Sequence, residues 1–297
     1  MADRDRDYVH GAPATDAVNR EDGNSYHLGP QEDSATALEK VRTAGSISIS
    51  PELFEKLYLS PKNAVKGDIR RTFGNPTPIA LGGFLLSLSP LSNVLLGWRG
   101  SGGLGAAEVG VYFFCGGLLM ILGAIFEFVL GNTFPSVVFG TFGAYWLAYA
   151  ATLTPYFNAT AAYQPNSPTT ASTNPEFAAS FAFFLLYMGL LCLIYLVCAL
   201  RTNVVFVLIF AGLVPAFSCL AASFWHLAQD NASTATTLQH AGAGLAFAVC
   251  LLGWYLFTVQ LLAAVDFPIN LPVGDLSHII KGASEKAKRK APNRDAS

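Results

Sequence analysis

Charged side chains are almost missing from the middle of the chain. Of the 18 Lys and Arg residues in 297, ten lie at or before Arg71 and six at or after Lys281, so only Arg99 and Arg201 lie between. Overall, 13% of the residues are charged and 52% are hydrophobic, whereas roughly 25% are charged in soluble domains. A soluble globule could not cover its surface with so little charge. The region between Arg71 and Lys281 is therefore predicted to lie in a membrane.

The apolar region divides into six segments that are long enough to cross a bilayer. A spanning helix needs about 20 mostly apolar residues. The segments are rich in Leu, Phe, Val, Ala and Gly and do not alternate with polar residues, which argues against an outer-membrane barrel. We expect an all-α integral membrane protein with six transmembrane helices per subunit, at residues 77–98, 105–130, 134–155, 176–199, 203–224 and 239–264.

The distribution of Lys and Arg predicts the orientation, because these residues accumulate in cytoplasmic loops. They crowd before the first segment and after the last, and Arg201 lies between the fourth and fifth. Six spans place all three groups on one side, so both termini are predicted to be cytoplasmic. Asn158 and Asn231 begin Asn-x-Ser/Thr acceptor sequences, and both fall on the predicted outer side.

The polar ends of the chain are predicted to lie outside the transport domain at 69–268. Residues 1–68 form a cytoplasmic tail, which we expect to be mostly disordered and without regular structure over residues 1–45. A short amphipathic helix is predicted near 51–59, and it suits either the membrane interface or the cytoplasmic face of the protein. Residues 269–297 form a basic cytoplasmic tail whose charge favours anionic lipid, not nucleic acid.

The cysteines are predicted to be free. All five fall inside predicted spans, so we expect no disulfide, metal site or cofactor. They are Cys115, Cys192, Cys198, Cys219 and Cys250.

The sequence "NPTP" at the start of the first span allows two interpretations. In one, Asn75 is an N-cap, and Pro76 and Pro78 occupy helix positions whose N–H groups need no partner. In the other, the amide of Asn75 and the hydroxyl of Thr77 bind an anionic substrate group at a helix end that faces a cavity.

A carboxylate near the end of the second span also allows two interpretations. Glu127 lies about one turn inside the predicted cytoplasmic end, where it either extends to the interface or faces a cavity. Since the second helix runs inward, Glu127 and Asn75 are expected at one depth in the membrane.

Four motifs in this region together resemble a known family. They are "NPTPIALGGF", "FEFVLGNTF", "FGAYWLA" and "LRTNVVFVLIF". Their order and spacing are similar to those of the acetate uptake transporters, which include the fungal acetate permeases and the bacterial succinate–acetate permeases. The long polar N-terminal tail looks like the fungal branch. The signature keeps Asn75, Pro76, Pro78 and Leu81, and Gly82 follows it, while Thr77, Ile79 and Ala80 replace the Ala, Leu and Gly of the family pattern.

The resemblance implies the roles of particular residues. Phe84, Phe142 and Leu213 would form a narrow apolar constriction, with Phe142 at a position where the family has Tyr. Asn75 and Thr77 would bind the substrate carboxyl at the inner vestibule. Glu127 would relay a proton or maintain the geometry of the vestibule.

The function implied is proton-coupled uptake of acetate and other short-chain monocarboxylates across the plasma membrane, by a homohexamer in contact with lipid. An ammonium or ammonia exporter and an acetate-sensing membrane protein are the alternatives. We do not expect an enzyme. An intramembrane serine protease needs a serine and a histidine within reach of each other at membrane depth, and the spans offer no such pair.

Overall fold

The computed structural model describes residues 25–28, 46–49, 73–163, 174–269 and 271–276. Within these residues, six helical segments are long and apolar enough to cross a membrane, and each overlaps one of the six predicted spans. Five of them are single α-helices: α4 (Thr77–Leu95), α7 (Thr133–Leu153), α8 (Pro175–Ala199), α9 (Val204–Ala228) and α10 (Ala232–Ala264). The prediction of an all-α membrane protein with six spans is confirmed.

The second span, Gly103–Val129, is built from four shorter pieces. A 3-10 turn, η2 (Gly103–Glu108), leads into α5 (Val109–Val111), a π-helical segment η3 (Tyr112–Leu119) and α6 (Met120–Val129). Single-turn π-bulges are the usual form of π-helix and often occur at functional sites, so an eight-residue π-segment is unusual. Further 3-10 turns, η1 (Trp98–Gly100), η4 (Pro155–Phe157) and η5 (Ala161–Tyr163), lie between the spans.

Three helix boundaries differ from the predicted ones by three residues or more, and one of them is the end of α9, at Ala228 instead of 224. The first span ends at Leu95 instead of 98, shortly before Gly97 takes a left-handed conformation with φ 70°. The last helix begins at Ala232 instead of 239, because polar side chains supply its hydrogen bonds. The side chain of Asn231 accepts from the N–H of Thr234 (3.2 Å), and the Thr236 hydroxyl donates to a carbonyl of its own helix (2.9 Å).

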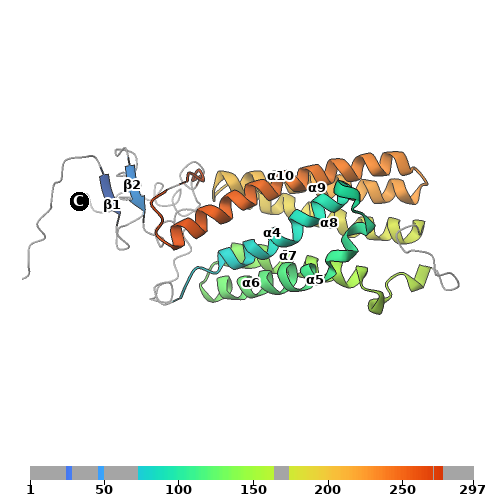
Figure 1. Cartoon of the computed structure of the whole chain (residues 1–297), viewed down its shortest axis with the longest axis horizontal. Helices are drawn as coiled ribbons and strands as arrows, with labels where there is room; N and C mark the ends of the chain where they lie inside the picture. Colours follow the sequence, from blue (N-terminus) through green and yellow to red (C-terminus); the bar gives the residue numbers. More distant parts are fainter. Residues whose placement is uncertain (1–24, 29–45, 50–72, 164–173, 270, 277–297) are drawn as a thin grey trace, which may run out of the picture.

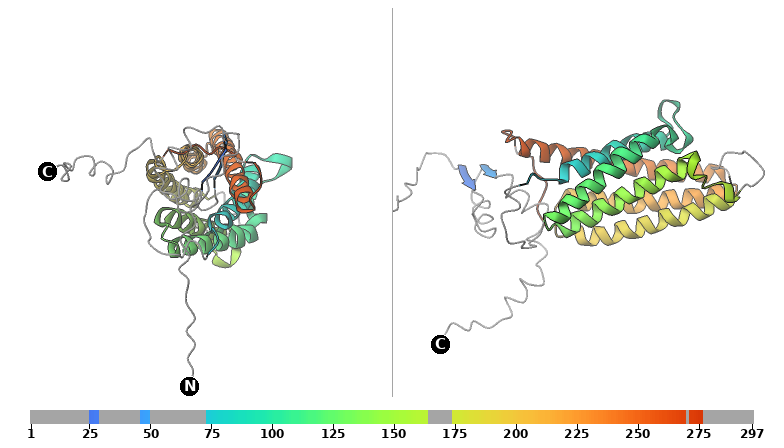
Figure 2. Two further views of the ribbon diagram at one scale, coloured as in Figure 1. Left: turned by 90° about the vertical axis from the view of Figure 1, so that its left-hand side faces the viewer. Right: turned by 90° about the horizontal axis from the view of Figure 1, so that it is seen from below.

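The six spans form a closed bundle, seen from the side in Figure 1 and along its axis in the left view of Figure 2. Neighbouring pairs around the bundle are α8 and α9, α9 and α10, α10 and α4, α4 and the second span, and the second span and α7. Aromatic contacts between α7 and α8 close the ring, with the ring centroids of Tyr145 and Phe184 5.6 Å apart.

Glycines allow the helices of one subunit to approach closely. A Cβ at Gly83 would lie 2.4 Å from the carbonyl oxygen of Cys115, so α4 and η3 touch there backbone to backbone. Gly212 of α9 faces Val249 of α10, and Gly242 of α10 faces Leu220 of α9. Gly212 and Gly242 therefore pack within the subunit.

The cysteines lie in the spans without disulfides, which confirms the prediction that they are free. Cys192 and Cys250 are buried, and Cys198 is exposed on the surface of α8.

The tails are described only in part. Strand β1 (Ser25–Leu28) pairs in parallel with β2 (Ser46–Ile49), with Ser25 opposite Ser46, whereas no regular structure was expected for residues 1–45. The predicted helix near 51–59 and the basic sequence from Lys281 onward lie outside the described residues. Residues 271–276 pack on the start of α9, where the N–H of Val204 donates to the carbonyl of Gly274 (2.8 Å).

Candidate functional site

The start of α4 shows how the "NPTP" sequence is used. The helix begins at Thr77, one residue after Pro76, and the side-chain oxygen of Asn75 accepts a hydrogen bond from the N–H of Thr77 (2.9 Å). Asn75 is exposed, and its NH2 group has no partner among the described residues. The N-cap residue is therefore Pro76 and not Asn75 as expected, and the Asn75 side chain accepts from Thr77 while its amide donor is left for another group.

Glu127 is fully buried and joins the ends of three spans. Its side chain is 0% exposed. One carboxylate oxygen accepts from the hydroxyl of Thr77 at the start of α4, and the other accepts from the amide of Asn132, just before α7 (2.6 Å). A buried carboxylate is costly unless donors compensate it, and hydrogen bonds to a charged group are the stronger kind. Glu127 therefore does not extend to the interface. We call these three residues the Glu127 clamp.

The Glu127 clamp changes what Thr77 can offer a ligand. A threonine hydroxyl has one proton, and Thr77 donates it to Glu127. Thr77 is also only 1% exposed. Its oxygen can accept a further hydrogen bond, but its proton is used within the protein. Of the two residues expected to bind the carboxyl, only Asn75 has an uncommitted donor and an accessible position.

The other residues of the signature mostly pack against neighbouring helices. Leu81 is buried, and Gly82 faces the ring of Phe257 in α10, which a Cβ would meet at 3.4 Å. Pro76 is buried and Pro78 is half-buried.

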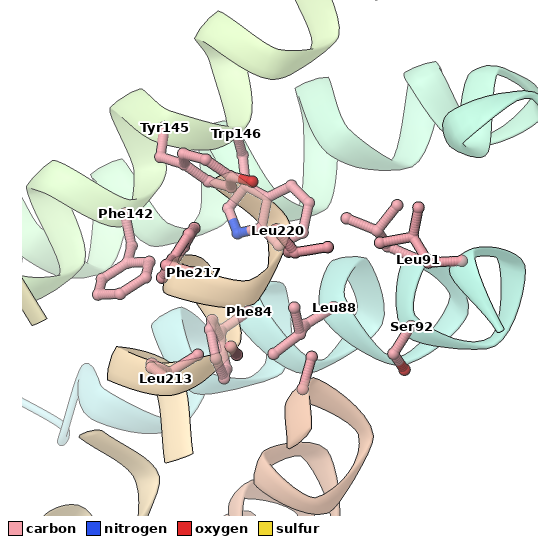
Figure 3. A pocket seen from close by; sticks show the side chains of 13 residues that line it. Phe84, Leu88, Leu91, Ser92, Phe142, Tyr145, Trp146, Leu213, Phe217 and Leu220 are labelled. Carbon is pink, nitrogen blue, oxygen red and sulfur yellow. The ribbon is translucent and has the colours of Figure 1, made fainter. Parts of the chain in front are cut away.

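The three residues expected to form the constriction line one cavity between α4, α7 and α9 (Figure 3). Phe84, Phe142 and Leu213 are 6%, 3% and 3% exposed. The rings of Phe84 and Phe142 meet edge to face, with centroids 5.9 Å apart. We call this space the central cavity. Its volume is about 30 Å³, which is room for one or two water molecules.

Aromatic residues that the sequence interpretation missed lie beside this trio. Tyr145 and Trp146 also line the central cavity, together with Phe217 of α9. In α7, Tyr145 and Trp146 follow Phe142 by three and four residues, and Tyr149 follows it by seven. This spacing places all four on one face of a helix, so the motif "FGAYWLAYA" already contained the signal.

A larger pocket lies at the opposite end of the bundle from the Glu127 clamp. Its volume is about 480 Å³, and Leu104, Tyr149, Asn158 and Phe181 are among the residues that line it. The Tyr149 hydroxyl donates to the carbonyl of Leu104 (2.5 Å) at its base. One turn below, the ring of Tyr145 stacks parallel to that of Tyr149, with centroids 6.1 Å apart. The two tyrosines therefore separate this pocket from the central cavity.

Comparisons of the sequence agree with this architecture. The model of the GPR1/FUN34/yaaH family matches residues 58–278. Protein alcS of Aspergillus fumigatus is 46% identical over 245 residues, which cover 82% of this chain and 90% of that protein. Acetate transporter protein patA of Penicillium expansum is 31% identical over 230 residues, covering 76% and 88%. Ammonia transport outward protein 2 of Saccharomyces cerevisiae is 26% identical over 239 residues, covering 75% and 77%.

A solved structure shares the fold. The bacterial acetate channel SatP superposes with a TM-score of 0.54 and 21% sequence identity. The match covers 68% of this chain and 99% of the SatP chain. At that identity the likeness establishes the six-helix fold alone. The match over residues 58–278 confirms the resemblance seen in the motifs, and the chain belongs to the GPR1/FUN34/yaaH family.

Proposed function

We propose that this protein is a transporter, not an enzyme, and that it carries acetate and other short-chain monocarboxylates through the central cavity. The position of the central cavity in the bundle is the main observation that supports this proposal. It lies between four of the six spans, with the Glu127 clamp toward one end and the large pocket at the other. The likeness to patA, which is named as an acetate transporter, supports the choice of substrate.

The lining of the central cavity favours a neutral solute over an ion. Of its thirteen lining residues, only Ser92, Tyr145 and Trp146 carry polar side-chain atoms, and none carries a formal charge. A bare carboxylate in such surroundings is very costly, whereas a neutral acid pays only for its polar groups. Protonation near a carboxyl pKa of about 4 to 5 produces that neutral form. Transport is therefore proposed to be coupled to protons.

Residues at the Glu127 end are proposed to receive the carboxyl. The NH2 group of Asn75 is exposed and can donate to it. The Glu127 clamp holds α4 against the second span and α7, and thereby fixes the position of Asn75. This geometry supports Glu127 as the residue that maintains the vestibule more than it supports a proton relay, because both carboxylate oxygens are occupied.

The setting of the protein is also part of the proposal. We place it in the plasma membrane with both termini cytoplasmic, as a homohexamer in contact with lipid. The larger pocket, beyond Tyr145 and Tyr149, then faces outward. Asn158 and Asn231 lie at that same end of the bundle.

The test compares a substitution that fills the central cavity with a control substitution on the exposed face of the same helix. Leu213→Trp adds a large ring to a cavity of about 30 Å³, whereas Leu208→Trp adds the same ring at an exposed position of the same helix, 47% exposed. Uptake of labelled acetate by proteoliposomes with an acidic exterior is expected for the native protein and for Leu208→Trp. Leu213→Trp should fall to the rate of protein-free liposomes. Equal uptake by both variants would place the pathway elsewhere.

Ammonia export is the second candidate. The likeness to Ammonia transport outward protein 2 favours it, and a narrow apolar cavity also suits a neutral ammonia molecule. The same proteoliposomes distinguish the two. Methylammonium efflux that Leu213→Trp abolishes, without cavity-dependent acetate uptake, would favour ammonia.

A further inference from the structure

The central cavity contains a buried hydrogen-bond donor with no acceptor. Trp146 is 1% exposed, and its Nε1 has no hydrogen-bond partner within the described residues. An indole N–H can only donate, and leaving such a group unpaired in an apolar interior costs free energy. Buried polar groups are almost always paired, so this one calls for an explanation.

Other tryptophans in the spans are paired. Trp225 donates to the carbonyl of Ala179 (3.3 Å), and Trp254 donates to the hydroxyl of Ser89 (3.0 Å). The unpaired indole is therefore a property of position 146 and not of tryptophans in this bundle generally.

Packing behind Trp146 fixes the direction of its N–H. The indole stacks on Tyr112, with ring centroids 5.2 Å apart and planes 22° apart. On the same side lies Gly116, where a Cβ would come within 2.4 Å of the indole Cγ. The indole therefore packs closely against Tyr112 and Gly116 on this side. Figure 3 shows the indole nitrogen turned toward the middle of the group of side chains that line the cavity.

The surroundings of this N–H define the ligand that it can bind. The cavity admits only a small molecule, and most of its lining is apolar, so the ligand must be small and uncharged. It must also supply an acceptor atom. The Ser92 hydroxyl donates to the carbonyl of Ser89 (2.8 Å), and although its oxygen can still accept, the Trp146 N–H is not bonded to it. A carbonyl oxygen on a two-carbon molecule supplies such an acceptor, and that molecule enters the space of about 30 Å³ only when the lining side chains move apart.

We infer that the indole N–H of Trp146 is the donor of a transient binding site for the carbonyl oxygen of a neutral monocarboxylic acid. The site lies one helical turn, about 6 Å, beyond Phe142 along α7, on the side away from the Glu127 clamp. This inference rests on the proposed function, because the binding site lies on the proposed transport path. On the inward path an acid reaches this site before Phe84, Phe142 and Leu213, and there it replaces part of its lost hydration.

Binding can be tested without changing Trp146 itself. The full-length protein with Trp98→Phe, Trp225→Phe and Trp254→Phe keeps Trp146 as its one fluorophore of this kind. Its emission is titrated with acetate at about pH 4.5 and about pH 7.5, and with acetamide, which carries a carbonyl but stays neutral at both values. We expect a saturable change with acetate at the lower pH only, and with acetamide at both. Sodium chloride at equal concentration should give none.

The matched control retains Trp254 instead, through Trp98→Phe, Trp146→Phe and Trp225→Phe. Its N–H is already paired, so neither probe should produce a saturable change. In transport, Trp146→Phe should raise the half-saturating concentration of acetate about three- to tenfold, and Trp254→Phe should leave it unchanged.

Failure of this inference differs from failure of the proposed function. Cavity-dependent acetate uptake without any saturable emission change at Trp146 would overturn the site and leave the transporter. Saturable emission without uptake would support the site and refute the transporter. Emission changes of equal size in the Trp146 and Trp254 proteins would also overturn the site, since the probe would then act through the bulk membrane phase.

Discussion

Removing the hydroxyl of Thr77 should destabilise the protein although the side chain is small and the change nearly isosteric. Thr77→Val takes away one side-chain donor to Glu127, whose carboxylate is 0% exposed. Asn132 still donates to the other carboxylate oxygen. Water cannot replace the lost donor without opening the contact between α4 and α6.

The size of the effect follows from the kind of bond. A hydrogen bond to a charged group is worth about 1.5–3 kcal/mol in soluble proteins, but interhelical bonds in membranes average about 0.6 and reach about 1.7 kcal/mol. A buried carboxylate lies at the upper end of the membrane range, so we expect Thr77→Val to cost about 1–2 kcal/mol. At about 2–4 °C per kcal/mol, the melting temperature should fall by about 2–8 °C.

Thermal unfolding of the purified protein in detergent measures this cost. Thr258→Val is the matched control, because the Thr258 hydroxyl is exposed and bonds only to the carbonyl of Trp254 in its own helix (2.9 Å). It should change stability by less than about 0.5 kcal/mol. In a Glu127→Leu background, Thr77→Val should become neutral or stabilising. An equal cost of Thr77→Val in both backgrounds would show that the Glu127 clamp is not what the hydroxyl stabilises.

Three further expectations concern the substrate path and the orientation. Asn75→Asp should abolish acetate uptake by repelling the carboxylate form, while Asn75→Ser can still accept from the N–H of Thr77 and should retain part of the uptake. Equal rates would leave Asn75 only this local hydrogen bond. Phe142→Ala should let lactate and succinate compete with labelled acetate, while Phe142→Tyr should keep the native order of competitors. If the order is unchanged in the alanine variant, the Phe142 ring only packs the bundle and does not select the substrate. In a background without native cysteines, Asn158→Cys should react with an impermeant thiol reagent from outside intact cells and Asp266→Cys should not; the reverse result would invert the topology.

The spans could be predicted because a bilayer imposes a composition that a single sequence reveals. Apolar runs located all six, but composition did not fix where each helix begins and ends. Ala232 to Gln239 is polar enough to look like a loop, yet it is helical because Asn231 caps it. The composite second span could not be predicted, since an apolar composition does not distinguish a π-helical segment from an α-helix.

The site was predictable to the extent that it follows helical periodicity. Phe84, Phe142 and Leu213 meet in one cavity, as expected from the motifs, and Tyr145 and Trp146 belong to the same face of α7 as Phe142. The Glu127 clamp was not predictable in detail. Thr77 and Glu127 are fifty residues apart, and only the packed bundle shows that Thr77 gives its proton to the carboxylate instead of to a ligand.

The pH dependence of acetate uptake at a fixed membrane potential tests the central claim most directly, namely that a neutral acid passes through the central cavity. Proteoliposomes receive constant total acetate over a range of external pH, and the rate of the Leu213→Trp protein is subtracted as leakage. Above a carboxyl pKa of about 4 to 5, the neutral fraction falls about tenfold for each pH unit. We predict that cavity-dependent uptake falls in parallel and does not respond to an imposed potassium diffusion potential. A rate that is constant with pH and follows the potential would show that the anion itself crosses, and would contradict the claim.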